Sequence, residues 1–433
     1  MNYLKWICLG AFLLFISCGE DEPENNKEVI PSVTVTIDSG ITYQAISGFG
    51  GANTIWGTDY LSSSEMDLAF GTGEDELGLS IFRVRLPSSE SDWAGLLNSI
   101  KQANERNVKV LASPWSPPAK WKSNNSVNGG GYLLEEHYAD FADYINSFIQ
   151  YMADRGAIVD VVSVQNEPDY QVSYEGCEYS TTEMLNFVKN YAGVITGAKL
   201  LAAESFNFKQ TYTNLILNDS EAVNNISIVG GHLYGSGLAS YSLAEQKGKE
   251  IWMTEHLLNL NSGENSNNWT EDTPAETIWE ETMDMVQEIH ASMSRNWNAY
   301  IWWYIRRYYS FLGDGEKGTT QGQILKRGYA MSQFSKFIRP GYVRIGYETK
   351  GAALDDMKLT AYLGDNKMVV VIINPTKRKI SEVELNAQSA IMSAVKYTTS
   401  LTENREMETL IPQNSSVSID LEVNSITTVV IGY

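Results

Sequence analysis

The stretch from Val161 to Asp169, V-V-S-V-Q-N-E-P-D, does most to limit what this chain folds into. A run of β-branched apolar residues that ends in polar residues and a proline is typical of a buried parallel strand carrying side chains at its carboxyl end. Glu167 is such a side chain. A second apolar run, I-W-M-T-E-H, ends in Glu255, 88 residues further on. That interval is roughly three βα units of about 30 residues each. We therefore expect both carboxylates at the same end of one parallel sheet.

The rest of the chain supplies further strands and helices for such a sheet. Eight apolar strand candidates alternate with helix-like stretches, at 47–52, 80–86, 108–113, 161–165, 199–203, 227–232, 250–254 and 299–303. The clearest helix is expected to begin at a capping box, Thr273-Pro274-Ala275-Glu276, and to run through Met293. Eight such repeats predict a (β/α)8 TIM barrel, whose active site lies at the carboxyl ends of the strands. Longer insertions after the third and seventh strands are expected to form the walls of the cleft.

Strands that do not belong to the barrel flank it in the sequence. Val33, Val35 and Ile37 alternate with threonines, and apolar residues alternate again towards the C-terminus, for example from Val417 to Val423. These segments predict an appended β-sandwich, formed by the C-terminal region and closed by the N-terminal strand. The predicted organisation places one or more sandwich strands at 33–46, the catalytic barrel at 47–340 and the β-sandwich side domain at 341–433.

The motifs around the two acids resemble those of a known family. N-E-P at 166–168 and T-E-H at 254–256 are similar to the acid/base and nucleophile motifs of clan A glycoside hydrolases, and specifically of family 30. The likeness is closest to the glucuronoxylanase branch, through W-W-Y-I-R-R at 302–307 and K-R-G-Y-A-M-S-Q-F-S-K-F-I-R-P-G-Y at 326–342. It extends roughly from Ser47 to the C-terminus. A barrel with a side β-sandwich is also the fold that this resemblance implies.

The resemblance implies roles for the two acids. Glu167 would be the acid/base and Glu255 the nucleophile of a retaining glycosidase, which needs two carboxyl groups about 5 to 5.5 Å apart, one protonated and one ionised. Asn166 would bind the 2-hydroxyl of the sugar whose bond is cut. A single glutamate more commonly caps a helix or pairs with an arginine, but two at strand ends among aromatic residues favour catalysis.

Further residues are expected beside the acids. Arg83 and Arg85 lie near the end of the second strand, on one face of it because side chains alternate. The resemblance favours Arg83 as the partner that holds Glu255 ionised. In G-H-L-Y-G, His232 and Tyr234 resemble the family's sixth-strand H-x-Y, whose tyrosine donates a hydrogen bond to the nucleophile. His232 is equally consistent with a structural residue at a strand end.

Tryptophans near the strand ends are candidates for stacking against sugar rings. Trp115, in S-P-W-S-P-P, and Trp303 fall among charged residues, and we expect them to line the cleft. The role of Trp302 stays open, because most tryptophans fill cores.

The segment W-W-Y-I-R-R-Y-Y bears on the choice of substrate. If the strand continues, four residues of one parity face the barrel mouth, namely Trp303, Ile305, Arg307 and Tyr309, while Arg306 faces the other way. Arg307 and Tyr309 match the glucuronate-binding arginine and tyrosine of the family, although a salt bridge from Arg307 to a nearby loop is a serious alternative. Two other hydrogen-bonding positions of the family pattern are occupied here by Leu257 and Leu260. The sequence therefore predicts a relaxed dependence on the uronic acid.

Composition limits the partners of the chain. With 32 basic and 53 acidic residues the net charge is −21, which argues against nucleic acid and is compatible with a neutral polysaccharide such as xylan. Four scattered histidines, without C-x-x-C or H-E-x-x-H, predict no metal site, and the expected mechanism needs no cofactor. Of the three cysteines, Cys8 and Cys18 lie in the N-terminal leader and its lipobox-like motif, so no internal disulfide with Cys177 is expected. We expect a monomer.

The N-terminal region predicts a lipoprotein. Lys5 followed by the apolar run 6–16 has the plan of a secretory signal and is too short to span a bilayer. I-S-C-G resembles a lipobox, which implies a signal peptide at 1–17 and acylation of Cys18, whereas an ordinary signal peptide with an incidental cysteine is the alternative. The acidic stretch 18–32 is typical of a tether and resembles surface-export signals of some Gram-negative lipoproteins. We expect the outer membrane, facing the cell exterior, with the lipid anchor as the only membrane contact.

These features together favour a retaining endo-β-1,4-xylanase that acts on glucuronoxylan and xylan by double displacement. Another family 30 specificity, such as a β-glucosidase, β-xylosidase or β-1,6-glucanase, is a second hypothesis. A third is a non-catalytic surface glycan-binding lipoprotein, which the intact pair of Glu167 and Glu255 disfavours.

Overall fold

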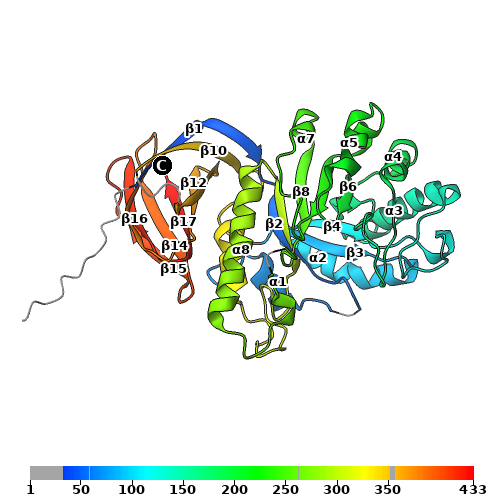
Figure 1. The fold of residues 1–433 in the computed structure, drawn as a ribbon, viewed down its shortest axis with the longest axis horizontal. Helices are drawn as coiled ribbons and strands as arrows, with labels where there is room; N and C mark the ends of the chain where they lie inside the picture. The colour runs from blue at the N-terminus through cyan, green and yellow to red at the C-terminus, as the bar shows by residue number, and fades with distance from the viewer. Residues whose placement is uncertain (1–32, 58, 262, 352–355) are drawn as a thin grey trace, which may run out of the picture.

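Eight parallel strands close into a barrel in the computed structural model, which describes residues 33–57, 59–261, 263–351 and 356–433 (Figure 1). The barrel strands follow one another in sequence order: β2 (Gly48–Ala52), β3 (Ile81–Leu86), β4 (Lys109–Pro114), β5 (Val161–Ser163), β6 (Lys199–Ser205), β7 (Ile228–His232), β8 (Glu250–Glu255) and β9 (Ala299–Tyr304). All eight strands expected from the apolar runs are present. The predicted (β/α)8 barrel is confirmed.

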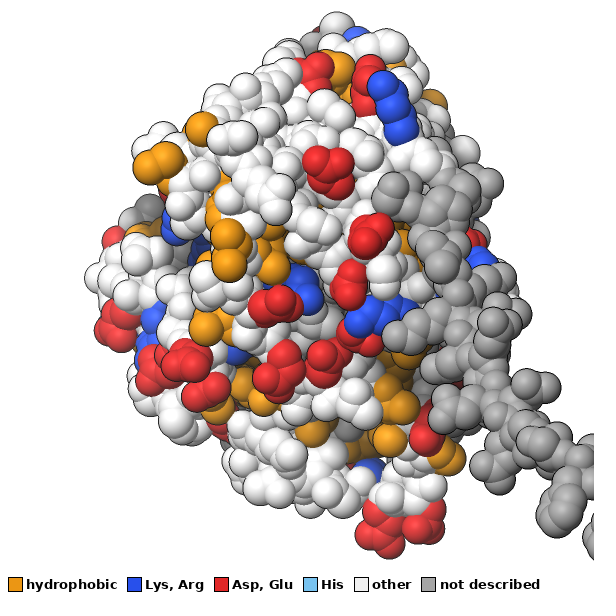
Figure 2. Space-filling view, turned by 90° about the vertical axis from the view of Figure 1, so that its left-hand side faces the viewer, with side chains coloured by type: hydrophobic (Ala, Val, Ile, Leu, Met, Phe, Trp, Pro, Cys, Tyr) orange, Lys and Arg blue, Asp and Glu red, His pale blue; other side chains and the backbone are white. Residues whose placement is uncertain are grey.

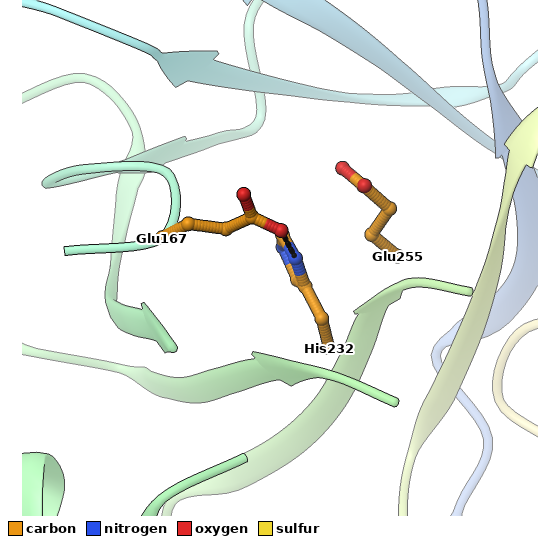
Figure 3. A group of neighbouring side chains, drawn as sticks. All are labelled: Glu167, His232 and Glu255. Carbon is orange, nitrogen blue, oxygen red and sulfur yellow. Dashed lines mark hydrogen bonds and ion pairs between the residues drawn. The ribbon is translucent and has the colours of Figure 1, made fainter. Parts of the chain in front are cut away.

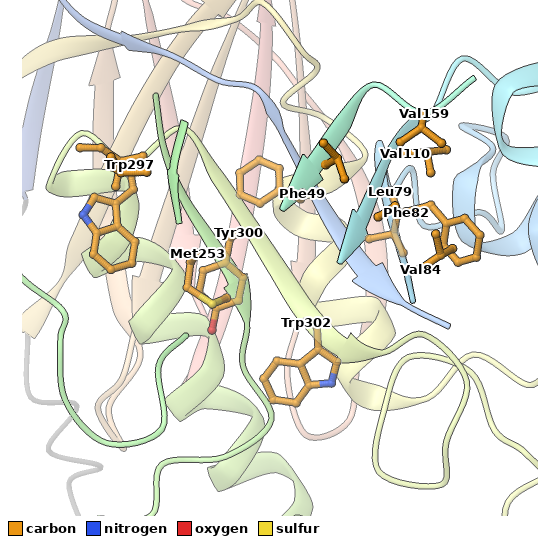
Figure 4. Packing of buried hydrophobic residues seen from close by; sticks show 14 of the residues in the cluster. Phe49, Leu79, Phe82, Val84, Val110, Val159, Met253, Trp297, Tyr300 and Trp302 are labelled. Atoms are coloured by element: carbon orange, nitrogen blue, oxygen red, sulfur yellow. The ribbon is translucent and has the colours of Figure 1, made fainter. Parts of the chain in front are cut away.

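Alternation along the strands separates the inside of the barrel from the layer beneath the helices. In β3, Ile81 packs into the centre of the barrel, whereas Phe82 and Val84 face outward into the large core (Figure 4). The same alternation turns Arg83 and Arg85 inward, nearer the carboxyl end of the strand than Ile81. The charged side chains of Arg83 and Arg85 therefore lie nearer the open end of the barrel than the apolar residues at its centre.

The outer face of the barrel is covered by helices. Those described are α1 (Ser63–Phe70), α2 (Leu97–Glu105), α3 (Tyr138–Ala153), α4 (Thr181–Asn190), α5 (Gln210–Asn218), α6 (Ala222–Asn225), α7 (Ser242–Gln246), α8 (Ala275–Ser294) and α9 (Lys326–Ser335). The predicted capping box of α8 is wrong, because Pro274 occupies the N-cap position and the Thr273 hydroxyl accepts a hydrogen bond from the Thr270 amide at 2.8 Å. None of the described helices is long and apolar enough to cross a membrane.

A second unit, the β-domain, lies beside the barrel (Figure 1). Its strands are β1 (Val33–Ala45), β10 (Val343–Lys350), β11 (Lys358–Gly364), β12 (Lys367–Asn374), β13 (Ile380–Asn386), β14 (Ser393–Thr399), β15 (Asn404–Leu410), β16 (Ser416–Leu421) and β17 (Ser425–Gly432). They form one sheet in the order β15-β14-β17-β12-β11-β10-β1-β13-β16. The N-terminal strand β1 pairs antiparallel with β10 and parallel with β13. The expected side domain, built from the C-terminal region and an N-terminal strand, is confirmed.

The β-domain sheet curls around a core of its own. Several strands contribute alternate apolar residues to this core, for example Val370 and Ile372 from β12. The opposite face of β12, with Val369 and Val371, belongs to the core that it shares with the barrel. This strand is therefore apolar on both faces and packs against both cores. Figure 2 views the molecule from the side of the β-domain, where acidic and basic side chains are intermixed.

Candidate active site

The two predicted acids meet at the carboxyl end of the barrel (Figure 3). Glu255 is the last residue of β8, and Glu167 follows β5, where its amide donates to the Glu204 carbonyl at 3.0 Å. A carboxylate oxygen of Glu167 lies within 4.8 Å of one of Glu255. Both side chains are almost buried, with 6% of each residue exposed. The backbone of Glu167 has a φ of 45°, a left-handed conformation that is strained for glutamate and is commonly found at functional sites.

Two donors hold the carboxylate of Glu255. Arg83 Nη1 donates to Oε2 at 2.5 Å, and the Tyr234 hydroxyl donates to Oε1 at 2.5 Å. Burial, together with the negative charge of Glu255, raises the pKa of Tyr234, so the phenol keeps its proton and remains a donor. These charge-assisted hydrogen bonds fix the orientation of the carboxylate, as a nucleophile requires. The expected contacts of Arg83 and Tyr234 with Glu255 are both present.

Glu167 lies in different surroundings. Burial raises the pKa of its carboxyl group, and the repulsion from Glu255 acts in the same direction, while His232 opposes both. His232 Nδ1 lies 3.0 Å from Glu167 Oε1. A raised pKa suits a general acid, which must carry its proton when the glycosidic bond breaks. His232 therefore contacts the acid side of the pair, while Tyr234, two residues later, contacts the other carboxylate.

Glu204 supports this arrangement from below. It is fully buried at the end of β6, with Oε1 3.1 Å from Arg83 Nη2 and 3.7 Å from His232 Nε2. Burial alone would raise the pKa of Glu204, but the positive charges of Arg83 and His232 lower it to about 2. Burial would likewise lower the pKa of His232, but the charge of Glu255 and hydrogen bonds to Glu167 and Glu204 raise it to about 9.

The buried charges therefore balance when Glu167 holds its proton. Two cations, Arg83 and His232, then face two anions, Glu204 and Glu255. This charge distribution accommodates a protonated Glu167, in keeping with the raised pKa of its carboxyl group. That is the protonation state from which a retaining glycosidase begins.

Asn166 lies beside the acids, as predicted. Its Oδ1 accepts a hydrogen bond from Arg83 Nη2 at 2.7 Å, and 4% of the residue is exposed. Because the carbonyl oxygen is engaged by Arg83, the amide nitrogen is the end of the side chain that can donate to a ligand. Tyr234 is supported by a ring stack, in which Phe206 lies 4.8 Å from Tyr234 and Tyr170 lies 4.2 Å from Phe206.

A cavity of about 710 Å³ opens over the acids. Its lining consists of Trp56, Arg85, Trp115, Val127, Asn128, Glu167, Tyr174, Glu175, Glu255 and Trp303. Trp115 and Trp303 line the cleft as expected, and their ring centroids are 6.2 Å apart. Trp302 is a core residue, 1% exposed, whose indole donates to the Ser310 hydroxyl at 2.9 Å. The insertion after the third strand contributes to the cavity wall, but the described part of the insertion after the seventh does not line it.

The predicted parity of the segment after Trp303 is wrong. Strand β9 ends at Tyr304, and the chain then turns, so that Ile305 packs in the outer core and not at the barrel mouth. Arg307 forms an ion pair with Asp59 at 2.6 Å and lies over the Tyr304 ring at 4.0 Å. The neighbouring Arg306 also pairs with Asp59. The salt bridge to a nearby loop, considered from the sequence as an alternative for Arg307, is therefore present.

Tyr309 lies in the same turn and is 8% exposed. Its carbonyl accepts a hydrogen bond from Arg327 Nη1 at 3.1 Å, and its ring packs against Tyr308. Of the two leucines that replace family hydrogen-bonding residues, Leu260 is 57% exposed and Leu257 packs partly against the large core. Neither Arg307 nor Tyr309 is among the residues that line the cavity over the acids.

Several site residues were not anticipated from the sequence. Glu204, in L-A-A-E-S, carried the same signal as the two predicted acids, a carboxylate at the end of an apolar strand. Glu175 and Trp56 lie on loops, where the sequence offers no periodicity from which to place a side chain. Arg85 was recognised as sharing a face with Arg83, but its position in the open cleft follows only from the structure.

The geometry of the acids also resembles that of a metal site. Glu167, His232 and Glu255 each offer a ligand atom, and these atoms lie within 4.8 Å of one another. However, both oxygens of Glu255 accept hydrogen bonds from Arg83 and Tyr234, and a protonated His232 has no lone pair to donate. The charge of Arg83 would repel a cation further. The arrangement therefore favours acid/base chemistry over metal binding.

Two carboxylates so close together, one bound by a cation and a phenol and the other with a raised pKa, at the strand ends of a (β/α)8 barrel are the machinery of glycoside hydrolysis, and the protein is a glycoside hydrolase. The chain belongs to glycosyl hydrolase family 30, since the profile of that family's TIM-barrel domain matches residues 75–305.

Individual relatives cover nearly the whole chain. Glucuronoxylanase XynC of Bacillus subtilis strain 168 is 35% identical over 414 residues, which are 93% of each chain. The family 30 subfamily 8 xylanase Xyn30A from Clostridium acetobutylicum has a similar structure, with a TM-score of 0.81 and 31% identity over 92% of this chain and 100% of that one. A family 30 endoxylanase from Clostridium papyrosolvens C71 gives a TM-score of 0.77 and 35% identity over 93% and 100% of the two chains. The predicted likeness to the glucuronoxylanase branch is confirmed.

Proposed function

We propose that the protein is a retaining endo-β-1,4-xylanase of the glucuronoxylanase type, acting on glucuronoxylan and xylan. The observation that carries the proposal is the pair Glu167 and Glu255, with carboxylate oxygens within 4.8 Å of each other beneath an open cleft. This separation suits direct attack by one carboxylate, because an inverting enzyme keeps its carboxyl groups about 6.5 to 9.5 Å apart to admit a water molecule. The xylanases among the relatives support xylan as the substrate.

In the first step, Glu255 attacks the anomeric carbon while Glu167 gives its proton to the leaving oxygen. The glycosidic bond breaks and a glycosyl ester of Glu255 forms. In the second step, Glu167, now ionised, takes a proton from a water molecule, which attacks the same carbon and releases Glu255. Arg83 and Tyr234 orient the nucleophile throughout, and the amide of Asn166 donates to the 2-hydroxyl of the reacting sugar.

The stereochemistry of the first products tests the mechanism. Early in the hydrolysis of xylohexaose, proton NMR should detect the β-anomer before mutarotation produces the α-anomer. Initial release of the α-anomer would mean inversion and would refute the assignment of Glu255 as nucleophile.

The pattern of products tests the substrate. Glucuronoxylan, arabinoxylan and linear xylan should each yield a range of oligosaccharides, because an endo-acting enzyme cuts within the chain. Release of single sugars only, or activity confined to aryl glucosides or β-1,6-glucan, would favour another family 30 specificity. Binding of these polysaccharides without any cleavage would favour a non-catalytic glycan-binding protein.

We propose that the dependence on the uronic acid is relaxed. Arg307 and Tyr309 match the family's glucuronate-binding residues, but the guanidinium of Arg307 already pairs with Asp59. A substrate carboxylate must therefore compete with that aspartate. Leu257 and Leu260 add no hydrogen bond, and each neutral hydrogen bond lost is worth about 0.5 to 1.5 kcal/mol. Selection for the uronic acid would fall by very roughly 10 to 100-fold, and unsubstituted chains would also be cut.

We further propose that the enzyme is a monomer, anchored by an acylated Cys18 to the outer membrane and facing the cell exterior. Cys18 lies outside the described residues, so this proposal depends on the lipobox-like I-S-C-G and the acidic stretch after it. The Cys18→Ala variant should leave the membrane fraction. Unchanged fractionation of that variant would refute the lipid anchor.

A further inference from the structure

Arg85 and Glu175 form an ion pair in the wall of the catalytic cavity. Arg85 Nη2 lies 2.5 Å from Glu175 Oε2, and the side chains are 19% and 4% exposed. Both residues line the same cavity as Glu167 and Glu255. The ion pair uses only part of each side chain. Arg85 Nε and Glu175 Oε1 are buried without a hydrogen-bond partner among the described residues.

An unpaired buried donor beside an unpaired buried acceptor is uncommon in a folded protein, because each such group has lost its hydration. Here the two atoms belong to one ion pair whose side chains line an open cleft. These side chains present a donor group and an acceptor group next to each other to a ligand in the cleft. Two neighbouring hydroxyl groups of a sugar have this pattern.

The cavity wall around Glu175 is held firmly in place. Residues Asn128 and Glu175 form an antiparallel bridge between the loops that follow β4 and β5, and Gly176 N donates to the Val127 carbonyl at 3.1 Å. Lys122 Nζ is buried against this wall and donates to the carbonyls of Gly130 at 2.7 Å and of Gly176 at 2.5 Å. The carboxylate of Glu175 is therefore positioned before a ligand arrives, which lowers the entropy lost on binding.

Aromatic rings complete the surroundings of the pair. The guanidinium of Arg85 lies 5.1 Å from the centre of the Trp56 ring, and Tyr174 meets Trp56 edge-on at 6.2 Å. Both rings line the cavity. Flat apolar faces next to fixed polar groups are typical of sugar-binding sites, since the ring C–H groups of a sugar pack on them.

We propose that Arg85 and Glu175 form a subsite for one neutral, unbranched sugar of the substrate chain, with the Arg85 guanidinium donating to one hydroxyl and the Glu175 carboxylate accepting from its neighbour. This inference rests on the proposed function, because it takes xylan as the substrate. In a β-1,4-linked xylose only the 2- and 3-hydroxyls are free. Engaging both leaves no position for a branch, so the subsite requires an undecorated sugar.

A uronic acid does not fit this subsite. Its carboxylate would have to approach Arg85 against the charge of Glu175, which already occupies the guanidinium, and Glu255 lies in the same cavity. Like charges at such distances repel strongly when they are partly buried. The pair therefore selects a neutral sugar, whereas the turn containing Arg307 remains the place for an acidic branch.

Binding measurements in a hydrolysis-deficient background test the subsite. Full-length Glu255→Gln protein would be compared with the same protein carrying Glu175→Gln, Arg85→Gln or, as a matched control, Glu408→Gln. Glu408 pairs with Lys396 at 2.5 Å on the β-domain. The ligands are linear xylohexaose and a xylo-oligosaccharide with one glucuronic acid branch, titrated calorimetrically. Thermal unfolding shows whether each variant is folded. If Arg85→Gln does not fold, the nearly isosteric Glu175→Gln is sufficient to test the subsite.

We expect Glu175→Gln and Arg85→Gln each to weaken xylohexaose binding about tenfold, the effect of losing a hydrogen bond to a charged group. Glu408→Gln should change nothing, and the branched ligand should lose affinity by the same factor. Equal xylohexaose affinity in all variants would overturn the subsite. Tighter binding of the branched ligand by Glu175→Gln would also overturn the subsite, because Arg85 would then bind the uronic acid. If the parent protein binds no xylohexaose and the unmodified enzyme cleaves none, the proposed function fails and the subsite with it.

Discussion

His232 is predicted to set the upper pH limit of activity through its charge. The imidazolium lies 3.0 Å from Glu167 Oε1, and its pKa is about 9, so it is protonated at neutral pH. A positive charge beside Glu167 lowers the pKa of this carboxyl group. The His232→Gln variant removes the charge but keeps a side-chain amide that can still donate to Glu167. It should therefore raise the pKa of Glu167 above its already elevated value.

The size of this effect follows from the geometry. Two unit charges about 4 Å apart interact by about 4 kcal/mol at an effective dielectric constant of about 20. At 1.36 kcal/mol per unit, that is about three pKa units. The glutamine amide recovers part of this energy through its hydrogen bond, so we expect a shift of about one to two units. The first step requires protonated Glu167, and the basic limb of the kcat/KM profile should move to higher pH by that amount.

The pH profile should be measured on linear xylo-oligosaccharides, whose poor leaving groups need the general acid. Because the second step requires ionised Glu167, kcat of the variant should also fall at acidic pH. His290→Gln is a matched control, since His290 lies on α8 and burial holds its pKa at about 4. A basic limb that stays in place, or moves to lower pH, in His232→Gln would show that His232 carries no charge beside Glu167.

The same histidine links stability to pH. Its pKa rises from 6.5 to about 9 on folding, so its contribution to the free energy of unfolding is fully present below pH 6.5 and is lost as the pH rises through 9. The His232→Gln variant should lack this dependence. Denaturant unfolding at pH 6 and pH 9.5 measures it directly.

Three further predictions concern the other charged groups of the site. The Glu255→Ala variant should lose hydrolysis while keeping its fold. Azide should restore cleavage of an activated aryl glycoside with inverted product stereochemistry, because the place of the nucleophile is vacated. An azide product of retained configuration would count against Glu255 as the nucleophile. Arg307→Ala should reduce kcat/KM on glucuronoxylan about tenfold more than on linear xylo-oligosaccharides. The turn should persist in this variant, since Arg306 still pairs with Asp59. An equal loss on both substrates would show that Arg307 does not contact the uronic acid. Glu204→Gln should lower the free energy of unfolding by about 3 to 5 kcal/mol at pH 7, because it breaks a buried ion pair with Arg83. Since the folded pKa of Glu204 is about 2, this loss of stability should shrink as the pH falls from 4.5 towards 2. A loss of stability that does not change with pH would refute the ionised state of Glu204.

Local patterns in the sequence were sufficient for the architecture. A barrel strand is a short apolar run, and its inward and outward residues follow from alternation, so each strand was recognisable without knowledge of its neighbours. The same reasoning placed Glu167 and Glu255 at one end of the barrel, since parallel strands end on one side. Arg83 followed from the alternation within β3 combined with the family resemblance.

Predictions failed where regular structure ended. The parity assigned to Arg307 assumed that β9 continues past Tyr304, but the chain turns there, and period two has no meaning in a turn. The capping box of α8 failed for a related reason, because Pro274 takes the N-cap position and leaves Thr273 outside it. Each error lies within a few residues of an element boundary.

The sequence by itself determined the barrel, the β-domain and the ends of the strands that carry the two acids, because these depend on periodicity and on the direction of parallel strands. Only the tertiary structure decided which charges meet. The pairing of Glu204 with Arg83, of His232 with Glu167 and of Arg85 with Glu175 joins residues on different strands or loops, and such distances depend on how the barrel closes. The protonation states of the acids follow from these contacts, and so does the chemistry of the site.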